Sequence, residues 1–445
     1  MFCAKIFDAT STGTAMRLRD KINIKAFETY FHGMSALEKL VHGNTLNIFD
    51  KDIVQNPYPH FSRMREERPV FYSWALRGWW VTEFELVQEV LRDKRFSADV
   101  RQFPERANKI RKSIGNDTER MERFENPSML NLDPPDHSRI RRLAQQGFLH
   151  KFIQSLEPGI GKIVDTCLAT TGNDTKFDVI EVLAKPLPAT VIAEMMGLPE
   201  SDHSQFQAWS EDLIDGTGTN DIEKIEASMM ASRQLINYFR KIIKQKRSEE
   251  GDDLIIQLIR AEEEGDMLTE IELYNTCLLV LVAGHETTTR LIGNGLYLLL
   301  HDREKWETLG SHPEKIATAV EEMLRFEPPV QATQRFVKED LSFHGHEFKK
   351  GQTVFVSIAA GNRDPRANER PDEFDLSRKK VNQVSFGYGI HLCIGASLAR
   401  LETKVTFEKL LAHYPDLALV SEKPQWGNNP FFRGHETLEV HKGIT

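Results

Sequence analysis

The sequence predicts a mainly α-helical protein with a smaller β part, built as one domain. Apolar residues recur at helical spacing from about residue 83 to about residue 324. Short runs typical of strands occur near residues 70–82 and again near residues 333–358. The composition, with 40% hydrophobic and 28% charged residues, is that of a globular protein, and no repeat or low-complexity tract is evident.

The expected elements follow one another without a long linker. Turn residues in Asn56-Pro-Tyr-Pro59 open the ordered part, and extended segments at residues 70–73 and 79–82 flank a turn at Arg77-Gly78. A helix is expected at residues 83–92. Further helices follow, separated by breaks at residues 133–135, 157–159, 171–173, 216–218 and 250–252. Strands are expected again at residues 333–337, 341–343 and 353–358. We expect residues 1–45 to form a partly helical N-terminal extension and residues 46–445 to form the domain.

Charge and cysteine content narrow the classes of function. The net charge is −9, so no general attraction to nucleic acid is expected. The four cysteines are scattered without CxxC spacing, which indicates neither a zinc site nor a disulfide framework. Free thiols are typical of a reducing compartment, so we expect the protein in the cytoplasm.

We expect no membrane association. The longest apolar run, residues 277–284, has eight residues, whereas a bilayer-spanning helix needs about 20. Residues 1–43 lack the apolar core of a secretory signal. The acidic residues Asp8, Asp20 and Glu28 argue against an organelle-targeting peptide.

Cys393 stands in the most informative segment, Phe386-Gly-Tyr-Gly389-Ile-His391-Leu-Cys393-Ile-Gly395. A helical pattern begins directly afterwards, and the N–H groups and dipole of a helix N-terminus favour a charged thiolate. The glycines let the backbone approach a large flat group. A lone cysteine is commonly a small buried hydrophobe, so the complete pattern is what indicates a ligand.

This segment resembles the haem-binding loop of the cytochrome P450 family, F-x-x-G-x-[HR]-x-C-x-G, with each defining position filled. The resemblance extends from about residue 56 to residue 440. It implies the single-domain P450 fold of the soluble bacterial type, with haem b as cofactor and the Cys393 thiolate as axial ligand of the iron. Phe386 and Gly389 match the loop positions that lie against the haem.

A second motif, Ala283-Gly284-His285-Glu286-Thr287-Thr288, lies inside a helix expected from about residue 269 to residue 300. Glycine costs about 1 kcal/mol relative to alanine in a helix interior. A charged side chain on an apolar helix must be paired or functional. A local distortion here would leave a groove for O2 and a water molecule. The motif resembles the family's A-G-x-[DE]-T, which implies that Glu286 and Thr287 deliver the protons for O–O cleavage; the alternative is a helix kink with a capping threonine.

Glu322 and Arg325 share a helix face and precede Phe326-Glu-Pro-Pro-Val330. Such a pair alone is common on surface helices, but with the Pro-Pro stop it resembles the family's ExxR helix. There the pair joins an arginine of a later irregular segment in a buried network. We expect Arg363, in Asn362-Arg363-Asp364-Pro365, to take that part.

Haem carries two propionates, which need basic partners. His137 and Arg141, at i and i+4 after Asp133-Pro-Pro, point the same way on an expected helix. The resemblance implies that they bind a propionate, and Arg335 and His391 match the remaining positions. For His137 taken alone, a surface histidine is the alternative.

The resemblance implies a haem-thiolate monooxygenase that inserts one oxygen atom of O2 into a C–H bond of a small or medium-sized organic substrate. The chain carries no flavin or nicotinamide fingerprint and no cysteine cluster, so we expect electrons from a separate ferredoxin and its reductase. We also expect a monomer. Two alternatives remain open, namely a peroxide-driven hydroxylase, which would not need Glu286 and Thr287, and a non-catalytic haem sensor.

The substrate is not determined by these residues. The family's specificity segments correspond here to about residues 96–130, 205–220, 330–333 and 430–433. Basic residues of the first segment form either a solvated helix face or an anchor for a polar group: Arg101, Arg106, Lys109, Arg111 and Lys112. Fatty acids, terpenoids, polyketides and O-methylated compounds all remain candidates.

Basic residues also flank the cysteine loop in the family's fold: Lys379, Lys380, Arg400, Lys404, Arg139 and Arg142. In an acidic chain, such a cluster predicts a docking face for an acidic ferredoxin. Ordinary solvated side chains are the alternative.

Overall fold

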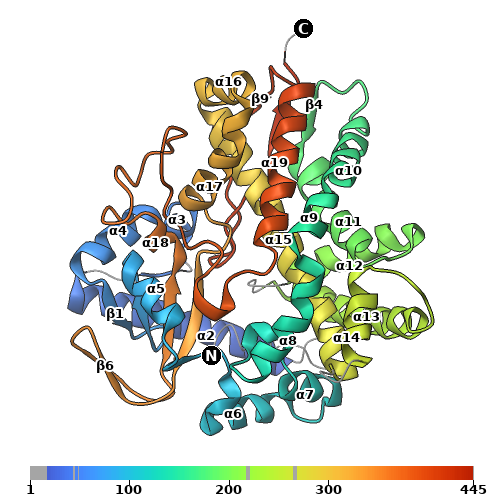
Figure 1. The fold of residues 1–445 in the computed structure, drawn as a ribbon. Helices are drawn as coiled ribbons and strands as arrows, with labels where there is room; N and C mark the ends of the chain where they lie inside the picture. The colour runs from blue at the N-terminus through green and yellow to red at the C-terminus, as the bar shows by residue number, and fades with distance from the viewer. Residues whose placement is uncertain (1–17, 44–45, 49, 217–220, 264–267, 444–445) are drawn as a thin grey trace.

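The structure is a computed structural model that describes residues 18–43, 46–48, 50–216, 221–263 and 268–443. In Figure 1 the β-rich part lies at the left, the helices α10 to α14 lie at the right, and α15 and α19 run between them. The α-helices are α2 (Leu18–His42), α3 (Lys51–Gln55), α4 (Tyr58–Glu67), α5 (Phe84–Arg92), α6 (Pro104–Ile114), α7 (Thr118–Glu125), α8 (Asp136–Ala144), α9 (His150–Ser155), α10 (Glu157–Ala169), α11 (Pro186–Met195), α12 (His203–Asp215), α13 (Ile222–Lys246), α14 (Leu254–Glu263), α15 (Glu270–His301), α16 (Arg303–Ser311), α17 (Ile316–Phe326), α18 (Ile358–Asn362) and α19 (Ala396–His413).

Short strands form three sheets among the described residues. The largest has the order β1-β2-β8-β5-β3, in which β2 and β8 are parallel and the other neighbours are antiparallel. Two smaller sheets have the orders β4-β10-β9 and β6-β7. The strands are β1 (Val70–Ser73), β2 (Gly78–Val81), β3 (Phe96–Ser97), β4 (Lys176–Asp178), β5 (Ala332–Val337), β6 (Leu341–Phe343), β7 (His346–Phe348), β8 (Thr353–Ser357), β9 (Ala418–Leu419) and β10 (Glu439–His441).

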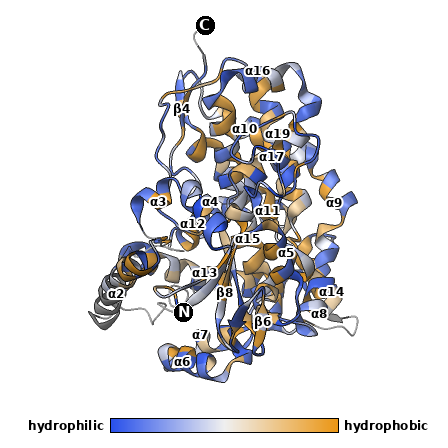
Figure 2. Ribbon diagram, turned by 90° about the vertical axis from the view of Figure 1, so that its left-hand side faces the viewer, coloured by the Kyte–Doolittle hydropathy of each residue, from blue (hydrophilic) through white to orange (hydrophobic). Residues whose placement is uncertain are grey.

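The main hydrophobic core surrounds α15. Leu281 and Ile292 of α15 are fully buried together with Val164 of α10, Met323 of α17 and Phe407 of α19. Figure 2 shows apolar residues concentrated in the centre, on α11 and α15. A capping box begins α15, because Thr269 Oγ1 accepts from Glu272 N and Glu272 Oε2 accepts from Thr269 N. This long helix therefore has a well-defined start.

The predicted fold class, mainly α with a smaller β part, is confirmed. The helix expected at residues 83–92 is α5, and the strands expected near residues 333–337, 341–343 and 353–358 are β5, β6 and β8. The two-residue strands β3 and β9 escaped prediction because they are too short to show a period of two.

Within residues 1–45, helix α2 is described, whereas residues 1–17 and 44–45 lie outside the described ranges. Its Phe31 is 1% exposed and packs in a cluster with Phe71 of β1 and Trp80 of β2. The described part of this helix is thus held against the large sheet.

Candidate haem site

Hydrogen bonds hold the loop before α19 in a tight turn. Cys393 N donates to Phe386 O (2.8 Å), and Leu392 N donates to Gly389 O (3.1 Å). Gly389 has a φ of +71°, and a Cβ added there would lie 2.9 Å from Leu91 O at the end of α5. A side chain at residue 389 would therefore push the loop away from α5.

Cys393 differs from the other described cysteines. Cys167 and Cys277 are buried, and burial raises the pKa of their thiols to about 11 and about 12. Cys393 leaves part of its surface uncovered, as do its neighbours Ile390 and Leu392, which are 50% and 46% exposed. An uncovered thiol flanked by apolar side chains suits a bound apolar ring.

Burial and the nearby positive groups have opposite effects on the pKa of the Cys393 thiol. Removal of water by the packed loop raises the pKa of its thiol, while the Gly395 backbone N–H and the Arg141 and Arg400 guanidinium groups act in the opposite direction. Arg400 also lies over the Phe386 ring, 4.5 Å from its centroid. The N–H group and the two cations offset part of the cost of a thiolate here, but burial has the larger effect and the pKa of the Cys393 thiol is raised overall.

Four basic residues converge beside this loop from three segments. The rings of His137, on α8, and His391 have centroids 4.2 Å apart. Arg141 Nη2 donates to Leu392 O (2.6 Å), and Arg335, on β5, donates to Gln334 O (2.8 Å). Burial, followed by the charges of Arg335 and His137, lowers the pKa of His391 to about 3.

This cluster fits an anionic group. Burial lowers the pKa of Arg335 to about 10, which shows how costly its charge is without a counter-ion. Among the described residues, His137 Nδ1 is buried without a hydrogen-bond partner. Two carboxylates of a bound cofactor would satisfy these donors, so the residues present fit haem propionates.

The A-G-H-E-T motif lies on α15, which is helical without interruption from Glu270 to His301. The expected local distortion therefore does not interrupt the helix. Thr287 Oγ1 donates to Ala283 O (2.7 Å), and Ala283 is exposed although Leu281 and His285 beside it are buried. An exposed alanine in the middle of a core helix indicates open space beside it.

Gly284 has a packing role that the sequence did not reveal. A Cβ there would lie 2.8 Å from Ile192 Cδ1, so glycine allows α11 to approach α15 closely.

Glu286 is ion-paired with Arg290 one turn later. His285 is buried, bonded to Ser210 Oγ and Lys185 O, and burial lowers its pKa to about 4. His285 is thus a neutral structural residue.

The ExxR network is present, but its third member was predicted wrongly. Arg325 donates two bonds of 2.7 Å to Glu322, and both side chains are fully buried. The further arginine on Glu322 is Arg378, whose Nε lies 3.0 Å from Glu322 Oε1. Asp375 N, three residues before Arg378, also donates to Glu322 Oε1 (3.0 Å).

Arg363, which was expected in that place, serves a second network. It follows α18 and pairs with Glu327 (3.3 Å), just beyond the end of α17, while its guanidinium lies 3.3 Å from the Tyr58 ring centroid. Arg433 also pairs with Glu327 (2.9 Å). Sequence distance could not tell which of the two arginines pairs with Glu322 and which pairs with Glu327.

Comparisons with known proteins show the family. The family pattern for Cytochrome P450 matches residues 81–309 and 316–427. The chain belongs to the cytochrome P450 family. As a member, it is a haem-thiolate monooxygenase that uses haem b held through a cysteine thiolate, O2, an organic substrate and a redox partner.

Relatives of this P450 act in different pathways. "Polyketide biosynthesis cytochrome P450 PksS" of Bacillus subtilis is 37% identical over 399 residues, which are 88% of this chain and 96% of the relative. "Vitamin D(3) 25-hydroxylase" of Pseudonocardia autotrophica is 37% identical over 380 residues, covering 84% and 90%. The structure of CYP109E1 from Bacillus megaterium in complex with corticosterone has a TM-score of 0.78 at 33% identity and covers 88% of this chain and all of that one.

The segments expected to contact the substrate are brought together in part. Residues 330 and 432 form a β-bridge, and Gln331 N donates to Phe431 O (2.9 Å), so the third and fourth segments of this P450 lie side by side. Of the second segment, residues 217–220 lie outside the described ranges.

Basic residues of the first segment are largely engaged within the P450 itself. Arg101 pairs with Asp99 (2.7 Å), Arg111 pairs with Glu125 (2.6 Å), and Arg106 donates to Gly351 O (2.6 Å). Lys109 and Lys112 are exposed. This arrangement argues against these basic residues as an anchor for a polar group of the substrate.

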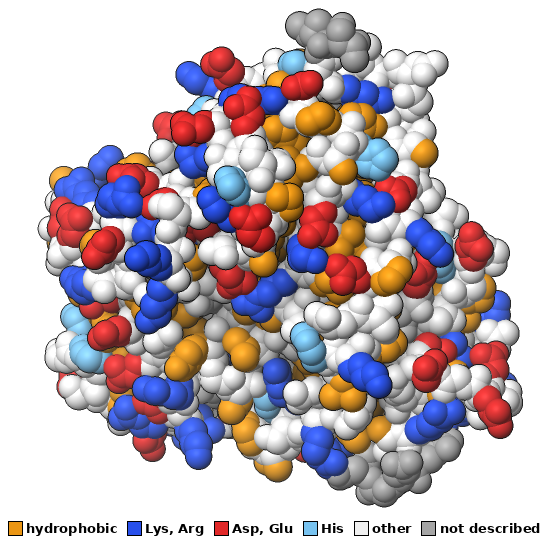
Figure 3. Space-filling model, turned by 45° about the horizontal axis from the view of Figure 1, so that its top comes forward, with side chains coloured by type: hydrophobic (Ala, Val, Ile, Leu, Met, Phe, Trp, Pro, Cys, Tyr) orange, Lys and Arg blue, Asp and Glu red, His pale blue; other side chains and the backbone are white. Residues whose placement is uncertain are grey.

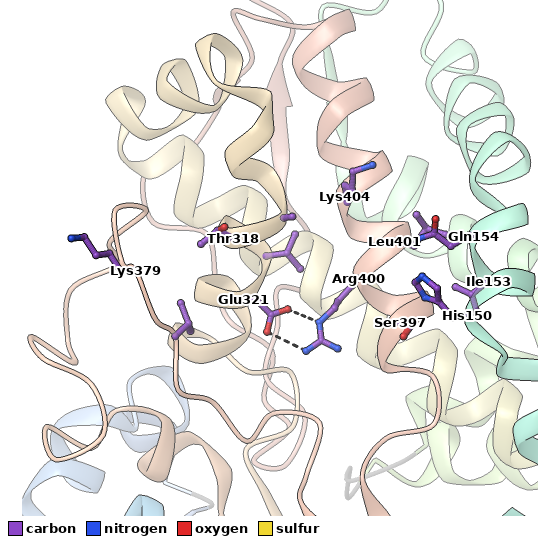
Figure 4. Close-up of a pocket in the computed structure, with 13 residues that line it drawn as sticks. His150, Ile153, Gln154, Thr318, Glu321, Lys379, Ser397, Arg400, Leu401 and Lys404 are labelled. Carbon is purple, nitrogen blue, oxygen red and sulfur yellow. Dashed lines mark hydrogen bonds and ion pairs between the residues drawn. The ribbon is translucent and has the colours of Figure 1, made fainter. Parts of the chain in front are cut away.

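The surface beside the cysteine loop is hollowed. A groove of about 540 Å³ lies between α9, α17 and α19. Figure 4 shows Lys379, Arg400 and Lys404 at this groove, with Arg400 directed at Glu321. Arg400, Lys404 and Arg139 pair with Glu321, Glu157 and Glu272, so the expected basic cluster is partly neutralised. Figure 3 likewise shows acidic and basic side chains intermixed on the face that it displays.

In the described ranges, none of the helices of this P450 combines the length and apolar character needed to cross a bilayer.

Proposed function

We propose that this P450 hydroxylates a C–H bond of a small or medium-sized, largely apolar organic molecule, with Cys393 as the axial ligand of the haem iron. The observation that carries the site assignment is the uncovered Cys393 thiol beside a partly buried cluster of basic side chains from α8, β5 and the loop. Phe386 and Gly389 complete the surface against the ring. His137, Arg141, Arg335 and His391 bind the propionates.

Haem bound through a thiolate supplies the activation of O2 and the oxidation of the C–H bond. The chain supplies the surroundings. The basic cluster neutralises the propionates and fixes the orientation of the ring. Glu286 would take up protons from solvent, and the Thr287 hydroxyl would pass them on toward the bound O2. One oxygen atom enters the substrate and the other leaves as water, with the uptake of two electrons and two protons.

The finer assignments rest on several features. Arg101, Arg106 and Arg111 of residues 96–130 are engaged within the protein, which supports an apolar substrate of polyketide or sterol size. The groove beside α19 and the exposed Lys379 support a separate ferredoxin as electron donor. We propose that residues 46–445 form the catalytic domain of a cytoplasmic monomer and that residues 1–45 form an extension.

A ferrous carbonyl spectrum tests the ligand assignment. The purified protein is expected to absorb at the long-wavelength position typical of thiolate-ligated haem. Cys393→Ala should lose this band and Cys393→His should shift it to the histidine-ligated position, whereas Cys277→Ala, a buried cysteine, should keep it. An unchanged band in both Cys393 variants would refute the assignment.

A turnover assay tests the reaction. A spin-state screen with fatty acids, terpenoids, polyketides and sterols identifies a ligand that displaces water. Product formation is then compared with NADH and a surrogate ferredoxin system, and with peroxide alone. Product from NADH supports the monooxygenase, product only from peroxide indicates the peroxide-driven alternative, and no product from any binding compound indicates a sensor.

A further inference from the structure

Arg290 lies one helical turn after Glu286 on α15, and its guanidinium forms an ion pair with the Glu286 carboxylate. The two side chains are 16% and 15% exposed. The pair is therefore shielded enough from water to hold a stable geometry, unlike most surface pairs.

A hairpin from the C-terminal segment packs on Arg290. Gly427 N donates to Gly434 O (2.8 Å), and residues 426 and 435 form an antiparallel bridge. A Cβ added at Gly434 would lie 2.7 Å from Arg290 Cγ, and one at Gly427 would lie 3.6 Å from Arg290 Nη1. Glycine at these positions lets the hairpin backbone rest on the Arg290 side chain, which fixes its direction.

The hairpin is itself well anchored. Trp426 and His435 stack with centroids 3.9 Å apart, and Tyr297, two turns beyond Arg290 on α15, packs on the His435 ring at 4.8 Å. Arg433, at the base of the hairpin, is held by Glu327. The position of Arg290 is thus determined by packing rather than by its own rotamer preference.

We propose that Arg290 is a positioning residue for proton delivery, which holds the Glu286 carboxylate in one place beside Thr287. This inference rests on the proposed function of Glu286. A glutamate has three rotatable bonds, and proton transfer needs its carboxylate within about 3 Å of its partner or of one bridging water. A guanidinium stays protonated, so Arg290 does not relay protons itself and acts through Glu286.

The test compares Arg290→Gln, Arg290→Lys, Glu286→Gln and the double variant Glu286→Gln/Arg290→Gln in NADH-driven turnover. Arg290→Gln should lower product formed per NADH several-fold, with peroxide in its place, and Arg290→Lys should restore part of the loss. The double variant should be no worse than Glu286→Gln alone, because the arginine acts through the glutamate. Arg303→Gln, which removes another i,i+4 pair on the surface helix α16, is the matched control.

Peroxide-driven turnover separates positioning from a general structural role, since peroxide already brings its protons. Arg290→Gln should match the wild type in peroxide-driven product, haem content and carbonyl band. Gly434→Ala, which presses on Arg290 without changing either member of the pair, should reproduce part of the uncoupling. Unchanged coupling in Arg290→Gln, or an equal loss with peroxide, would overturn the proposal.

Infrared difference spectra against Glu286→Gln give a readout that does not depend on turnover. The carboxylate bands of Glu286 should shift in Arg290→Gln, and unshifted bands would overturn the proposal whatever the activity. A wild-type protein that forms no product from NADH would instead refute the proposed function, and with it the role in proton delivery.

Discussion

The imidazole rings of His137 and His391 lie 4.2 Å apart, although one belongs to α8 and the other to the loop that carries Cys393. The buried His137 and the partly buried His391, with the buried Arg335 beside them, form a cluster of donors. Asp133 is the carboxylate whose charge reaches this cluster, and it is already engaged by Ala98 N (3.0 Å). A bound anion would therefore supply an acceptor for these donors and compensate the buried charge of Arg335.

We expect Arg335→Leu and His137→Phe to lower the haem content of the purified protein several-fold, because each removes a buried donor for a propionate. The haem-to-protein ratio after purification and after addition of excess haemin measures this. His413→Phe, at the far end of α19, is the control. Full haem content in Arg335→Leu would show that the propionates lie elsewhere.

Glu322 and Arg378 should be energetically coupled, whereas Glu322 and Arg363 should not. A double-mutant cycle with Glu322→Gln, Arg378→Gln and Arg363→Gln measures both couplings by unfolding of the holoprotein. Loss of one partner of a buried pair costs about 3–5 kcal/mol. A larger coupling of Glu322 to Arg363 than to Arg378 would contradict the observed network.

Thr287→Ala should keep the fold and the haem but uncouple the reaction, so that NADH consumption continues while peroxide replaces most of the product. Glu286→Gln should slow turnover, since protons then reach the site less readily. Peroxide per NADH is the measurement. Thr276→Ala, which loses the same kind of bond to a carbonyl four residues earlier on α15, is the control and should stay coupled.

Glu402 predicts an unusual pH dependence of stability. It is 1% exposed on α19, and burial raises its pKa from 4.5 to about 8. Between these values the folded state binds one more proton than the unfolded state, so this residue lowers stability as pH rises, by an amount on the order of a few kcal/mol above pH 8. Glu402→Gln should match the wild type near pH 5 and be more stable near pH 8.

Thermal unfolding of the holoprotein at both pH values checks this prediction. Glu408→Gln, on the same helix and partly exposed, should show no such crossover. If the difference in stability between the wild type and Glu402→Gln is the same at both pH values, Glu402 is paired or hydrated in solution.

Electron transfer should depend on the charge beside α19. The Lys379→Glu/Arg142→Glu double variant should slow reduction by an acidic ferredoxin several-fold, and the wild-type rate should fall as salt screens the charges. Stopped-flow reduction at several ionic strengths measures both effects. Lys349→Glu, in the turn between β7 and β8, should leave the rate unchanged, and substrate affinity should stay constant in both variants.

Much of the fold and the site could be predicted from local patterns. The cysteine loop, the Glu286-Thr287 motif and the Glu322-Arg325 pair each lie within ten residues, where hydrogen bonds and helix geometry relate residue type to position directly. The helices and the longer strands followed from their periodicity for the same reason.

Contacts between distant segments depended on the folded chain. Whether Arg378 or Arg363 reaches Glu322 depends on how an irregular segment crosses α17, and no short-range period records that path. The fixed direction of the Arg290 side chain could not be predicted, because the hairpin that packs on it comes more than a hundred residues later in the chain. Likewise, Arg400 and Lys404 of α19 have carboxylate partners on α17 and α10 that no spacing along the chain predicts. Local motifs depend on residues that are close in the sequence, so the sequence alone predicts them. The pairing of side chains, their burial and the energetic cost of a buried charge depend on packing between distant segments, which only the tertiary structure decides.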